Sequence, residues 1–237
     1  MSQNTSSAVM AQRHEPNDSL EFFPTPPWAT RAVVRWLNRH GQIGPSMTAW
    51  DPCSGRGHMV RPLREYFREV RASDVFDHGA GAEVEDFLFP GAEPRGEDWI
   101  FFNFPFRLGL EFITRALSFE SVGVAALART AFLEGGGRFE GLFKVSPPSV
   151  ILQFAERVIM AKDRCRDPAL PYWDAEAGRK KKPSTATAYC WIVWFPPPRP
   201  AETKFDWIPP CRRDLECPGD YDPSEQPPEK SGLIKED

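Results

Sequence analysis

The first part of the chain alternates between apolar positions at helical spacing and short continuous apolar runs. Residues 28–40 show the helical spacing, with Thr25 placed as an N-cap and prolines in the first turn. Similar patterns predict further helices at 58–67 and 107–117. The apolar runs predict strands at 47–50, 98–102 and 122–129, and the stretch 69–74, which ends in an acid, is predicted to be a further strand. This alternation predicts an α/β fold with a doubly wound, mostly parallel sheet, whose ligand site lies at the carboxyl ends of the strands.

The pattern changes further along the chain. Apolar runs occur at 149–154, 157–161 and 188–195 without long helices between them, which favours an antiparallel C-terminal hairpin added to the parallel sheet. Residues 163–187 form a long basic insertion loop that also contains several prolines. Insertions of this length in compact domains are usually functional or disordered.

The two ends of the chain differ in composition from the part between them. Ten of the 25 prolines lie after Phe195, where acidic residues also outnumber basic ones. We expect 196–237 to be a Pro-rich acidic tail that buries too little apolar surface to fold by itself. Residues 1–20 are polar and are expected to be disordered. One globular domain is therefore predicted for residues 21–195, with a net charge close to zero.

Composition disfavours several classes of protein. No apolar run is long enough to span a bilayer, and the N-terminus lacks the apolar segment of a secretory signal, so we expect a cytoplasmic protein without membrane contact. Five cysteines without a Cys-x-x-Cys pair and four scattered histidines predict neither a disulfide framework nor a metal site. The neutral body gives no global attraction to nucleic acid, although a local basic patch would still bind phosphate.

A glycine-containing segment follows the first predicted strand. The sequence DPCSGRG contains Asp51, Pro52, Cys53, Gly55 and Gly57. Its glycines have no side chain and allow the backbone to approach a ligand closely. The segment lacks the Lys-Ser/Thr pair of a P-loop and the third glycine of a dinucleotide-binding turn. A tight turn between strand and helix is the structural alternative.

Two further acidic positions have a similar placement. Asp74 ends the run 69–74, where a carboxylate can accept hydrogen bonds from ribose hydroxyls. Asp86 precedes Phe87, and the pair could offer a carboxylate to an adenine amine and a ring to its face. Each acid, taken alone, also fits a solvated position.

The sequence NFPF follows the strand predicted at 98–102. Together with Phe23-Pro24-Thr25-Pro26, DPCSGRG and the two acids, it forms an ordered set of motifs. This set resembles the S-adenosylmethionine-dependent amino-methyltransferases of DNA, in particular the small adenine-specific enzymes found in phages and prophages. The resemblance covers roughly Phe22 to Phe195, and the order and spacing of the motifs carry it.

The resemblance implies a class I methyltransferase-like Rossmann fold for the domain at 21–195. It also implies S-adenosyl-L-methionine as the cofactor and DNA as the partner. The implied cofactor-binding residues are Phe23, Thr25, Asp51, Pro52, Cys53, Gly55, Gly57, Asp74, Asp86 and Phe87. The implied catalytic residues are Asn103, Phe104, Pro105 and Phe106.

The chemistry of amine methylation accounts for this catalytic motif. The lone pair of the exocyclic nitrogen of adenine is delocalised into the ring, so its attack on a methyl group needs positioned hydrogen-bond acceptors. The side-chain oxygen of Asn103 and the main-chain carbonyl of Phe104 can accept both amine hydrogens. Because the target base has to leave the duplex, we expect Phe106 to stack on it.

Phe104 replaces the first proline of the family's Asn-Pro-Pro-Phe motif. Phenylalanine keeps the carbonyl group, and its position before Pro105 still favours an extended conformation. Two alternatives stay open. One is methylation of an amine or amide in RNA or protein, and the other is a non-catalytic binding protein in which Phe104 blocks the base pocket.

Basic residues of the insertion are candidates for contact with nucleic acid, since they could bind phosphates while Tyr172 and Trp173 stack on a displaced base. These candidates are Arg164, Arg166, Arg179, Lys180, Lys181 and Lys182. A solvated run of charge is the alternative. His58 directly follows Gly57, and we expect it to belong to the first helical turn without a catalytic role.

Overall fold

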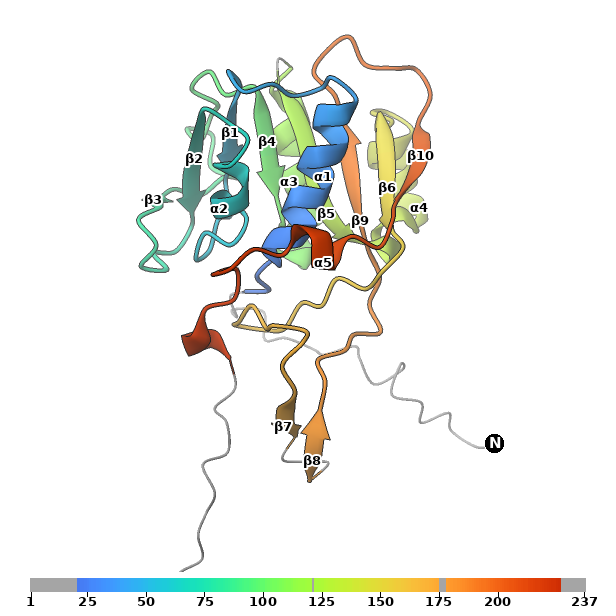
Figure 1. Ribbon diagram of the computed structural model, residues 1–237. Coiled ribbons are helices and arrows are strands. Elements are labelled where there is room, and N and C mark those ends of the chain that lie inside the picture. Colours follow the sequence, from blue (N-terminus) through green and yellow to red (C-terminus); the bar gives the residue numbers. More distant parts are fainter. Residues whose placement is uncertain (1–20, 121, 175–177, 227–237) are drawn as a thin grey trace, which may run out of the picture.

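A central eight-stranded sheet organises the computed structural model, which describes residues 21–120, 122–174 and 178–226 (Figure 1). Along the sheet the strands follow the order β10-β6-β9-β5-β4-β1-β2-β3. Their bounds are β1 (Thr48–Asp51), β2 (Glu69–Asp74), β3 (Glu83–Val84), β4 (Trp99–Phe102), β5 (Gly123–Arg129), β6 (Val150–Phe154), β9 (Tyr189–Trp194) and β10 (Lys204–Ile208). A separate hairpin consists of β7 (Tyr172–Asp174) and β8 (Arg179–Lys181).

Neighbouring strands of the sheet are parallel, except that β9 runs antiparallel to both β5 and β6. The expected α/β fold, with a doubly wound and mostly parallel sheet and an antiparallel C-terminal hairpin, is confirmed. β5 and β9 are buried almost throughout, which explains their continuous apolar sequences. The strand expected at 157–161 is wrong, because this stretch contributes only an isolated bridge between Ala161 and Arg164.

Helices cover both faces of the sheet (Figure 1). The α-helices are α1 (Pro27–Arg39), α2 (Val60–Leu63), α3 (Gly109–Ser118), α4 (Gly136–Arg138) and α5 (Arg212–Leu215). Short 3-10 helices occupy Phe106–Leu108, Thr130–Leu133 and Pro223–Glu225, and a π-helical turn occupies Phe139–Phe143. α1 packs on the face that carries Phe101 and Leu127, whereas α3 packs on the opposite face with Ile100. Each of the described helices is too short or too polar to cross a bilayer.

Two expected helix boundaries are corrected. Pro26, and not Thr25, occupies the N-cap position of α1, because the helix begins one residue later than expected. The helix expected at 58–67 is reduced to the four residues of α2 and is followed by turns. Pro62 lies in this segment and has no N–H group to continue a helical hydrogen-bond ladder.

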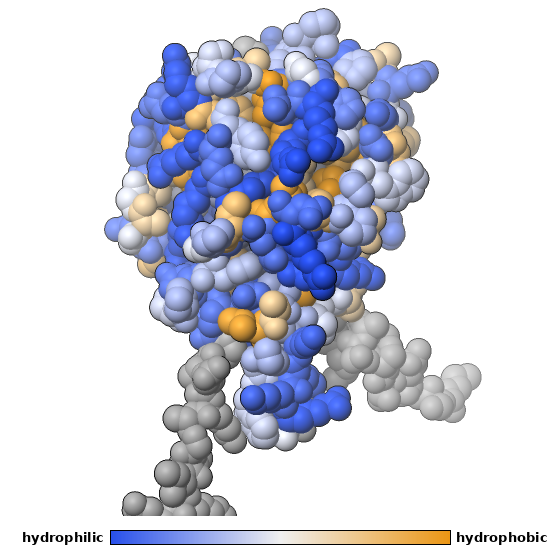
Figure 2. Space-filling view, in the orientation of Figure 1, coloured by the Kyte–Doolittle hydropathy of each residue, from blue (hydrophilic) through white to orange (hydrophobic). Residues whose placement is uncertain are grey.

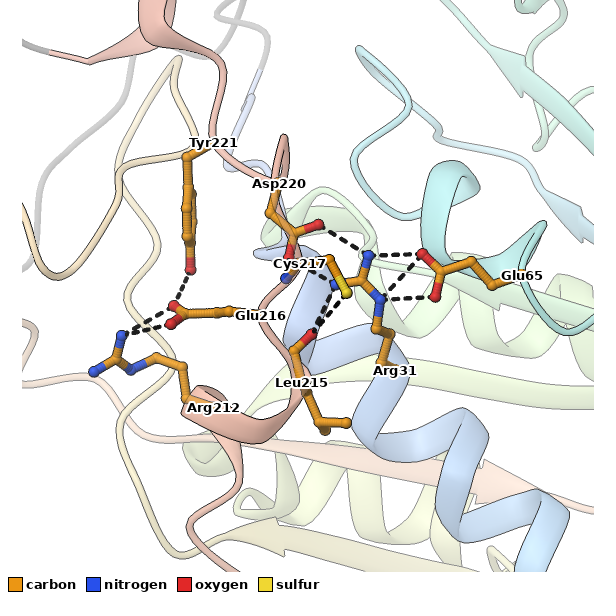
Figure 3. Close-up of polar contacts among 8 residues, drawn as sticks. All are labelled: Arg31, Glu65, Arg212, Leu215, Glu216, Cys217, Asp220 and Tyr221. Atoms are coloured by element: carbon orange, nitrogen blue, oxygen red, sulfur yellow. Dashed lines mark hydrogen bonds and ion pairs between the residues drawn. The ribbon is translucent and has the colours of Figure 1, made fainter.

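The expectation of an extended tail at 196–237 is wrong for the described part of this segment. β10 pairs in parallel with β6, and Ile208 and Leu215 are buried in the main core. The guanidinium of Arg31 donates hydrogen bonds to Asp220 at 2.6 Å, to Glu65 at 2.6 Å and to the carbonyl of Leu215 at 2.8 Å (Figure 3). Composition was misleading because this segment buries apolar side chains and the paired carboxylate of Asp220. Residues 1–20 and 227–237 lie outside the described residues, so the expectations for them stay untested.

Candidate active site

A cavity of about 240 Å³ lies at the carboxyl ends of β1, β2 and β4. These three strands are neighbours in the sheet, so residues distant in sequence meet at one edge. The predicted residues in its wall are Phe23, Thr25, Asp51, Pro52, Cys53, Asp74, Asp86, Phe87, Asn103 and Pro105. The structure therefore gathers most of the predicted cofactor and catalytic residues around one cavity.

Asn103 follows β4 and has a fixed side-chain amide. Its Nδ2 donates a hydrogen bond to the main-chain carbonyl of Phe23 at 2.7 Å. Its Oδ1 is buried and has no hydrogen-bond partner among the described residues. Cys53 Sγ donates to the main-chain carbonyl of Asn103 at 3.4 Å and so ties the residue to the glycine-containing loop. An unpaired acceptor in a cavity wall is available to a donor group of a ligand.

Phe104 does not line the cavity. Its side chain is only 2% exposed and packs in the core on the α3 face of the sheet. The ring lies against Gly109 and Phe132, and a Cβ atom added to Gly109 would stand 2.4 Å from Phe104 Cε2. The Phe104 ring therefore does not fill this cavity.

Phe106 also lies outside the cavity wall. The guanidinium of Arg129 stands 3.9 Å from the centre of the Phe106 ring, and the ring of Phe23 lies at 5.5 Å. Phe106 begins a 3-10 turn directly after Pro105, a residue of the cavity wall. The described structure thus places the Arg129 guanidinium over the ring that was expected to stack on a base.

The glycine-containing loop is held by the acids at the strand ends. Asp51 Oδ1 accepts a hydrogen bond from the Cys53 N–H at 3.2 Å, and Asp74 Oδ2 accepts one from the Gly55 N–H at 2.8 Å. Burial raises the pKa of Asp51 well above its usual value, and burial also raises the pKa of the Cys53 thiol. The two acids therefore shape the loop in addition to lining the cavity.

Phe22, which the sequence did not single out as a site residue, covers this loop. Gly55 has φ +51°, and a Cβ atom there would stand 2.4 Å from the Phe22 ring. The same ring stacks on His78 at 4.9 Å. Gly57 also has positive φ but, like Gly55, contributes no side chain to the wall. Glycine at position 55 is thus required both by backbone conformation and by the ring above it.

Asp86 and Phe87 form another part of the wall. Asp86 Oδ1 accepts a hydrogen bond from the Leu88 N–H at 2.9 Å, and its side chain remains exposed. Phe87 is buried and packs edge-on against Trp50, with ring centres 5.2 Å apart. The arrangement combines a carboxylate with apolar surface, which suits a planar group that carries an amine.

Further polar groups of the wall are buried without a hydrogen-bond partner among the described residues. They are Thr25 Oγ1, Ser54 Oγ and His58 Nδ1. Buried polar groups are normally paired, so such a concentration indicates a polar ligand. Sequence reasoning missed Ser54, although it lies inside DPCSGRG, and it gave His58 no role. These groups, with the carboxylates of Asp51 and Asp74, fit a ligand that carries an amino acid end and a ribose.

The basic insertion begins beside this cavity. The Asp163 N–H donates to the carbonyl of Phe22 at 2.9 Å, and Arg56 donates to the carbonyl of Asp163 at 3.2 Å. From there the chain runs into the hairpin β7–β8, which projects from the domain as a largely hydrophilic arm (Figures 1 and 2). The guanidinium of Arg166 lies 4.4 Å from the ring centre of Tyr172.

The predicted basic residues differ in exposure. Arg179, Lys180 and Lys182 are exposed on or next to β8, whereas Arg164, Arg166 and Lys181 are half-buried. Among the described residues, no group of three or more histidine, cysteine, aspartate or glutamate side chains could hold a metal ion. The site therefore consists of a cavity with acidic and amide groups and an adjoining basic arm.

Comparisons with known proteins bear on the fold. No protein-family model and no curated protein matches the chain in sequence. A candidate class I S-adenosylmethionine-dependent methyltransferase of Listeria monocytogenes superposes with a TM-score of 0.52 at 11% identity, covering 78% of this chain and 65% of that one. A candidate RNA methyltransferase of Pyrococcus horikoshii gives a TM-score of 0.52 at 15% identity, covering 82% and 98%.

These likenesses confirm the expected Rossmann-like fold of class I methyltransferases. In sheet order, β3-β2-β1-β4-β5 is followed by the antiparallel β9 and then β6, with β10 as an additional edge strand. The chain spans about 65% of the length of the Listeria protein. At these identities the likeness concerns the fold alone.

Proposed function

We propose that the protein transfers a methyl group from S-adenosylmethionine to the exocyclic amine of adenine in DNA. The observation that carries the proposal is the buried Oδ1 of Asn103, a residue of the cavity wall, which has no hydrogen-bond partner in the described part of the chain. A single oriented acceptor of this kind suits an amine whose lone pair has to be freed from its ring. The methyltransferase fold and the position of the cavity at the carboxyl ends of the strands also support the proposal.

In this proposal S-adenosylmethionine supplies an electrophilic methyl group when bound. Asp74 would hold its ribose, Asp86 and Phe87 its adenine, and the wall groups that lack a hydrogen-bond partner among the described residues its amino acid end. Asp51, Pro52, Cys53, Phe23 and Thr25 also line the cavity and would contact the cofactor. No strong base is required, because the amine proton can leave after the methyl group has been transferred.

Asn103 then orients the acceptor amine. The hydrogen bond from Nδ2 to Phe23 prevents the amide from rotating, so Oδ1 stays directed to the amine. The main-chain carbonyl of Phe104 serves as the second acceptor, and Pro105 favours the extended backbone that this requires. The Phe104 ring does not oppose this role because it points into the core.

Phe106 stacks on the target base in the proposal, and Arg129 has to leave its ring when the base arrives. Cation–π contacts of this kind are worth about 0.5–2 kcal/mol, so a base that stacks well can displace the guanidinium. This movement also brings a positive charge close to the phosphates that flank an extruded nucleotide.

The hairpin β7–β8 supports a duplex DNA partner. A two-stranded ribbon fits the major groove of B-form DNA, whereas the major groove of A-form RNA is too deep and narrow for side chains to read. Arg179, Lys180 and Lys182 on or beside β8 would contact phosphates, together with Lys181, Arg164 and Arg166 nearer the domain. We place the nucleic-acid contact of this proposal on these residues.

The test is incorporation of labelled methyl groups from S-adenosylmethionine into unmethylated duplex DNA, followed by nucleoside digestion. The proposal expects N6-methyladenine as product and loss of the signal in Asn103→Ala. Asn38→Ala is the matched control because Asn38 is exposed on α1. Methylated RNA or protein in place of DNA would assign the other acceptor classes, and no transfer to any acceptor would refute the enzymatic proposal.

A further inference from the structure

The C-terminal segment contacts His58, a residue of the cavity wall. Glu225, in the 3-10 turn Pro223–Glu225, is only 9% exposed. Its Oε2 accepts a hydrogen bond from the Cys165 N–H at 2.6 Å and lies 3.2 Å from His58 Nε2. Its Oε1 lies 3.4 Å from an Arg56 nitrogen. One carboxylate thus joins the glycine-containing loop, the root of the insertion and the end of the described chain.

His58 is the member of this cluster that lines the cavity. The side chain is 3% exposed, and its Nδ1 has no hydrogen-bond partner among the described residues. Burial is the main cause that lowers the pKa of His58, and Arg61 and Arg56 lower it further, while Glu225 opposes them. The ring is therefore neutral at pH 7. Because a carboxylate only accepts hydrogen bonds, Nε2 carries the proton and Nδ1 keeps a lone pair.

We propose that His58 Nδ1 accepts a hydrogen bond from the α-ammonium group of S-adenosylmethionine, and that Glu225 is a positioning residue that fixes the required tautomer. This inference rests on the proposed function, since it names the contact made by the amino acid end of the proposed cofactor. It assigns a role in the site to a segment that lies more than 160 residues from His58 along the chain.

The surrounding groups complement the two charges of an amino acid. Thr25 Oγ1 and Ser54 Oγ are buried hydroxyl oxygens without partners among the described residues, and both can donate to a carboxylate. The Asp74 carboxylate in the same wall favours a positive charge in the cavity. An ammonium group beside the neutral imidazole of His58 would therefore find a hydrogen-bond acceptor and a favourable electrostatic potential.

Arg31 holds the C-terminal segment in place for this contact. Its guanidinium bridges Glu65, next to α2, and Asp220, five residues before Glu225 (Figure 3). Asp220 also accepts a hydrogen bond from the Cys217 N–H at 2.9 Å. The position of Glu225 is consequently set by a buried network as well as by its own contacts.

The experiment compares the affinities of two ligands by calorimetry. S-adenosylhomocysteine carries the amino acid end, and 5′-methylthioadenosine lacks it. We expect His58→Ala to lower the affinity for S-adenosylhomocysteine roughly tenfold to a hundredfold, as for loss of one hydrogen bond to a charged group. The affinity for methylthioadenosine should stay unchanged. His40→Ala is the matched control, because His40 is exposed after the end of α1.

Nitrogen NMR of the histidine rings gives a second readout that does not depend on activity. We expect His58 of the wild-type protein to show the tautomer protonated at Nε2, and Glu225→Leu to lose that preference together with part of the S-adenosylhomocysteine affinity. Retained binding of methylthioadenosine shows that each variant is folded.

Three outcomes would overturn the inference. His58→Ala with unchanged affinity for S-adenosylhomocysteine refutes the contact, while the cofactor proposal survives. Equal losses for both ligands assign His58 a merely structural role. Wild-type protein that binds neither ligand refutes the proposed cofactor itself and, with it, this contact.

Discussion

The Asn103 side chain donates a hydrogen bond from Nδ2 to the main-chain carbonyl of Phe23 at 2.7 Å. This contact joins the segment before α1 to the end of β4, two parts of the chain separated by 80 residues. It orients an amide whose oxygen, Oδ1, has no hydrogen-bond partner within the described ranges and belongs to a residue of the cavity wall. The N-terminal segment thus contributes to the geometry of the proposed catalytic group as well as to closure of the cavity.

Asn103→Asp tests this orientation with a side chain of nearly equal size. A carboxylate cannot donate to the Phe23 carbonyl, so the side chain loses its fixed direction and two acceptor oxygens approach each other. We expect methyl transfer to fall by roughly 10²–10³-fold, as for loss of one positioned polar group in an active site. Calorimetry with S-adenosylhomocysteine should show nearly unchanged affinity. Asn38→Asp is the control, and transfer at the wild-type rate in Asn103→Asp would contradict the orienting role.

Phe104→Ala tests the assignment of this ring to the core. The substitution leaves a void beside Gly109 and Phe132, and we expect the free energy of unfolding to decrease by about 3–5 kcal/mol. Urea denaturation followed by fluorescence measures the change. Phe139→Ala is the control, because the Phe139 side chain is 54% exposed and its loss should change stability by less than about 0.5 kcal/mol. Equal effects of the two substitutions would show that Phe104 is not a core residue.

Gly55→Ala tests the packing of Phe22 on the glycine-containing loop. The new methyl group would stand 2.4 Å from the Phe22 ring, so the ring or the loop has to move. We expect a loss of S-adenosylhomocysteine affinity that Phe22→Ala partly restores in the double variant. Gly41→Ala separates the two causes, since Gly41 also has positive φ but nothing within 4 Å of its added Cβ. A loss of affinity in Gly41→Ala of the same size would argue against a steric origin.

The pH dependence of ligand affinity tests the state of His58. Burial lowers the pKa of this histidine below its usual value of 6.5, against the opposing effect of Glu225. As the pH falls below 6.5 and through this lowered pKa, Nδ1 gains a proton and can no longer accept a hydrogen bond. We therefore expect the affinity for S-adenosylhomocysteine to decrease with acidification more steeply in the wild type than in His58→Ala. Identical pH profiles, measured by calorimetry, would exclude His58 as the titrating group.

The salt dependence of DNA binding tests the arm formed by β7 and β8. Replacing Arg179 and Lys180 by alanine removes two exposed charges. If both contact phosphates, the slope of log affinity against log salt concentration becomes smaller by roughly 1.8, at about 0.9 per contact. Fluorescence anisotropy with a labelled duplex gives this slope. Lys144→Ala is the control, since its charge is exposed and paired with Glu140, and an unchanged slope in the double variant would remove the hairpin from the interface.

Sequence patterns predicted the structure best where the local preference of a segment for helix or strand agrees with its place in the tertiary structure. β2 (Glu69–Asp74) was delimited correctly as a strand that ends in an acid at the carboxyl edge of the sheet. The alternation of strands and helices along the chain also predicted the parallel sheet correctly. Short or irregular elements were not predictable in this way, as α2 and the stretch 157–161 show.

The sequence by itself determined the alternating α/β order and the identities of the groups at the strand ends, including Asp51, Asp74 and Asn103, since these depend on local periodicity and motif spacing. Only the tertiary structure decided that Phe104 turns into the core and that Phe106 is covered by Arg129. It also decided that the acidic C-terminal segment folds back to place Glu225 against His58. These features depend on which surfaces meet across long stretches of chain, and burial of paired charges there reverses what composition predicts for an isolated segment.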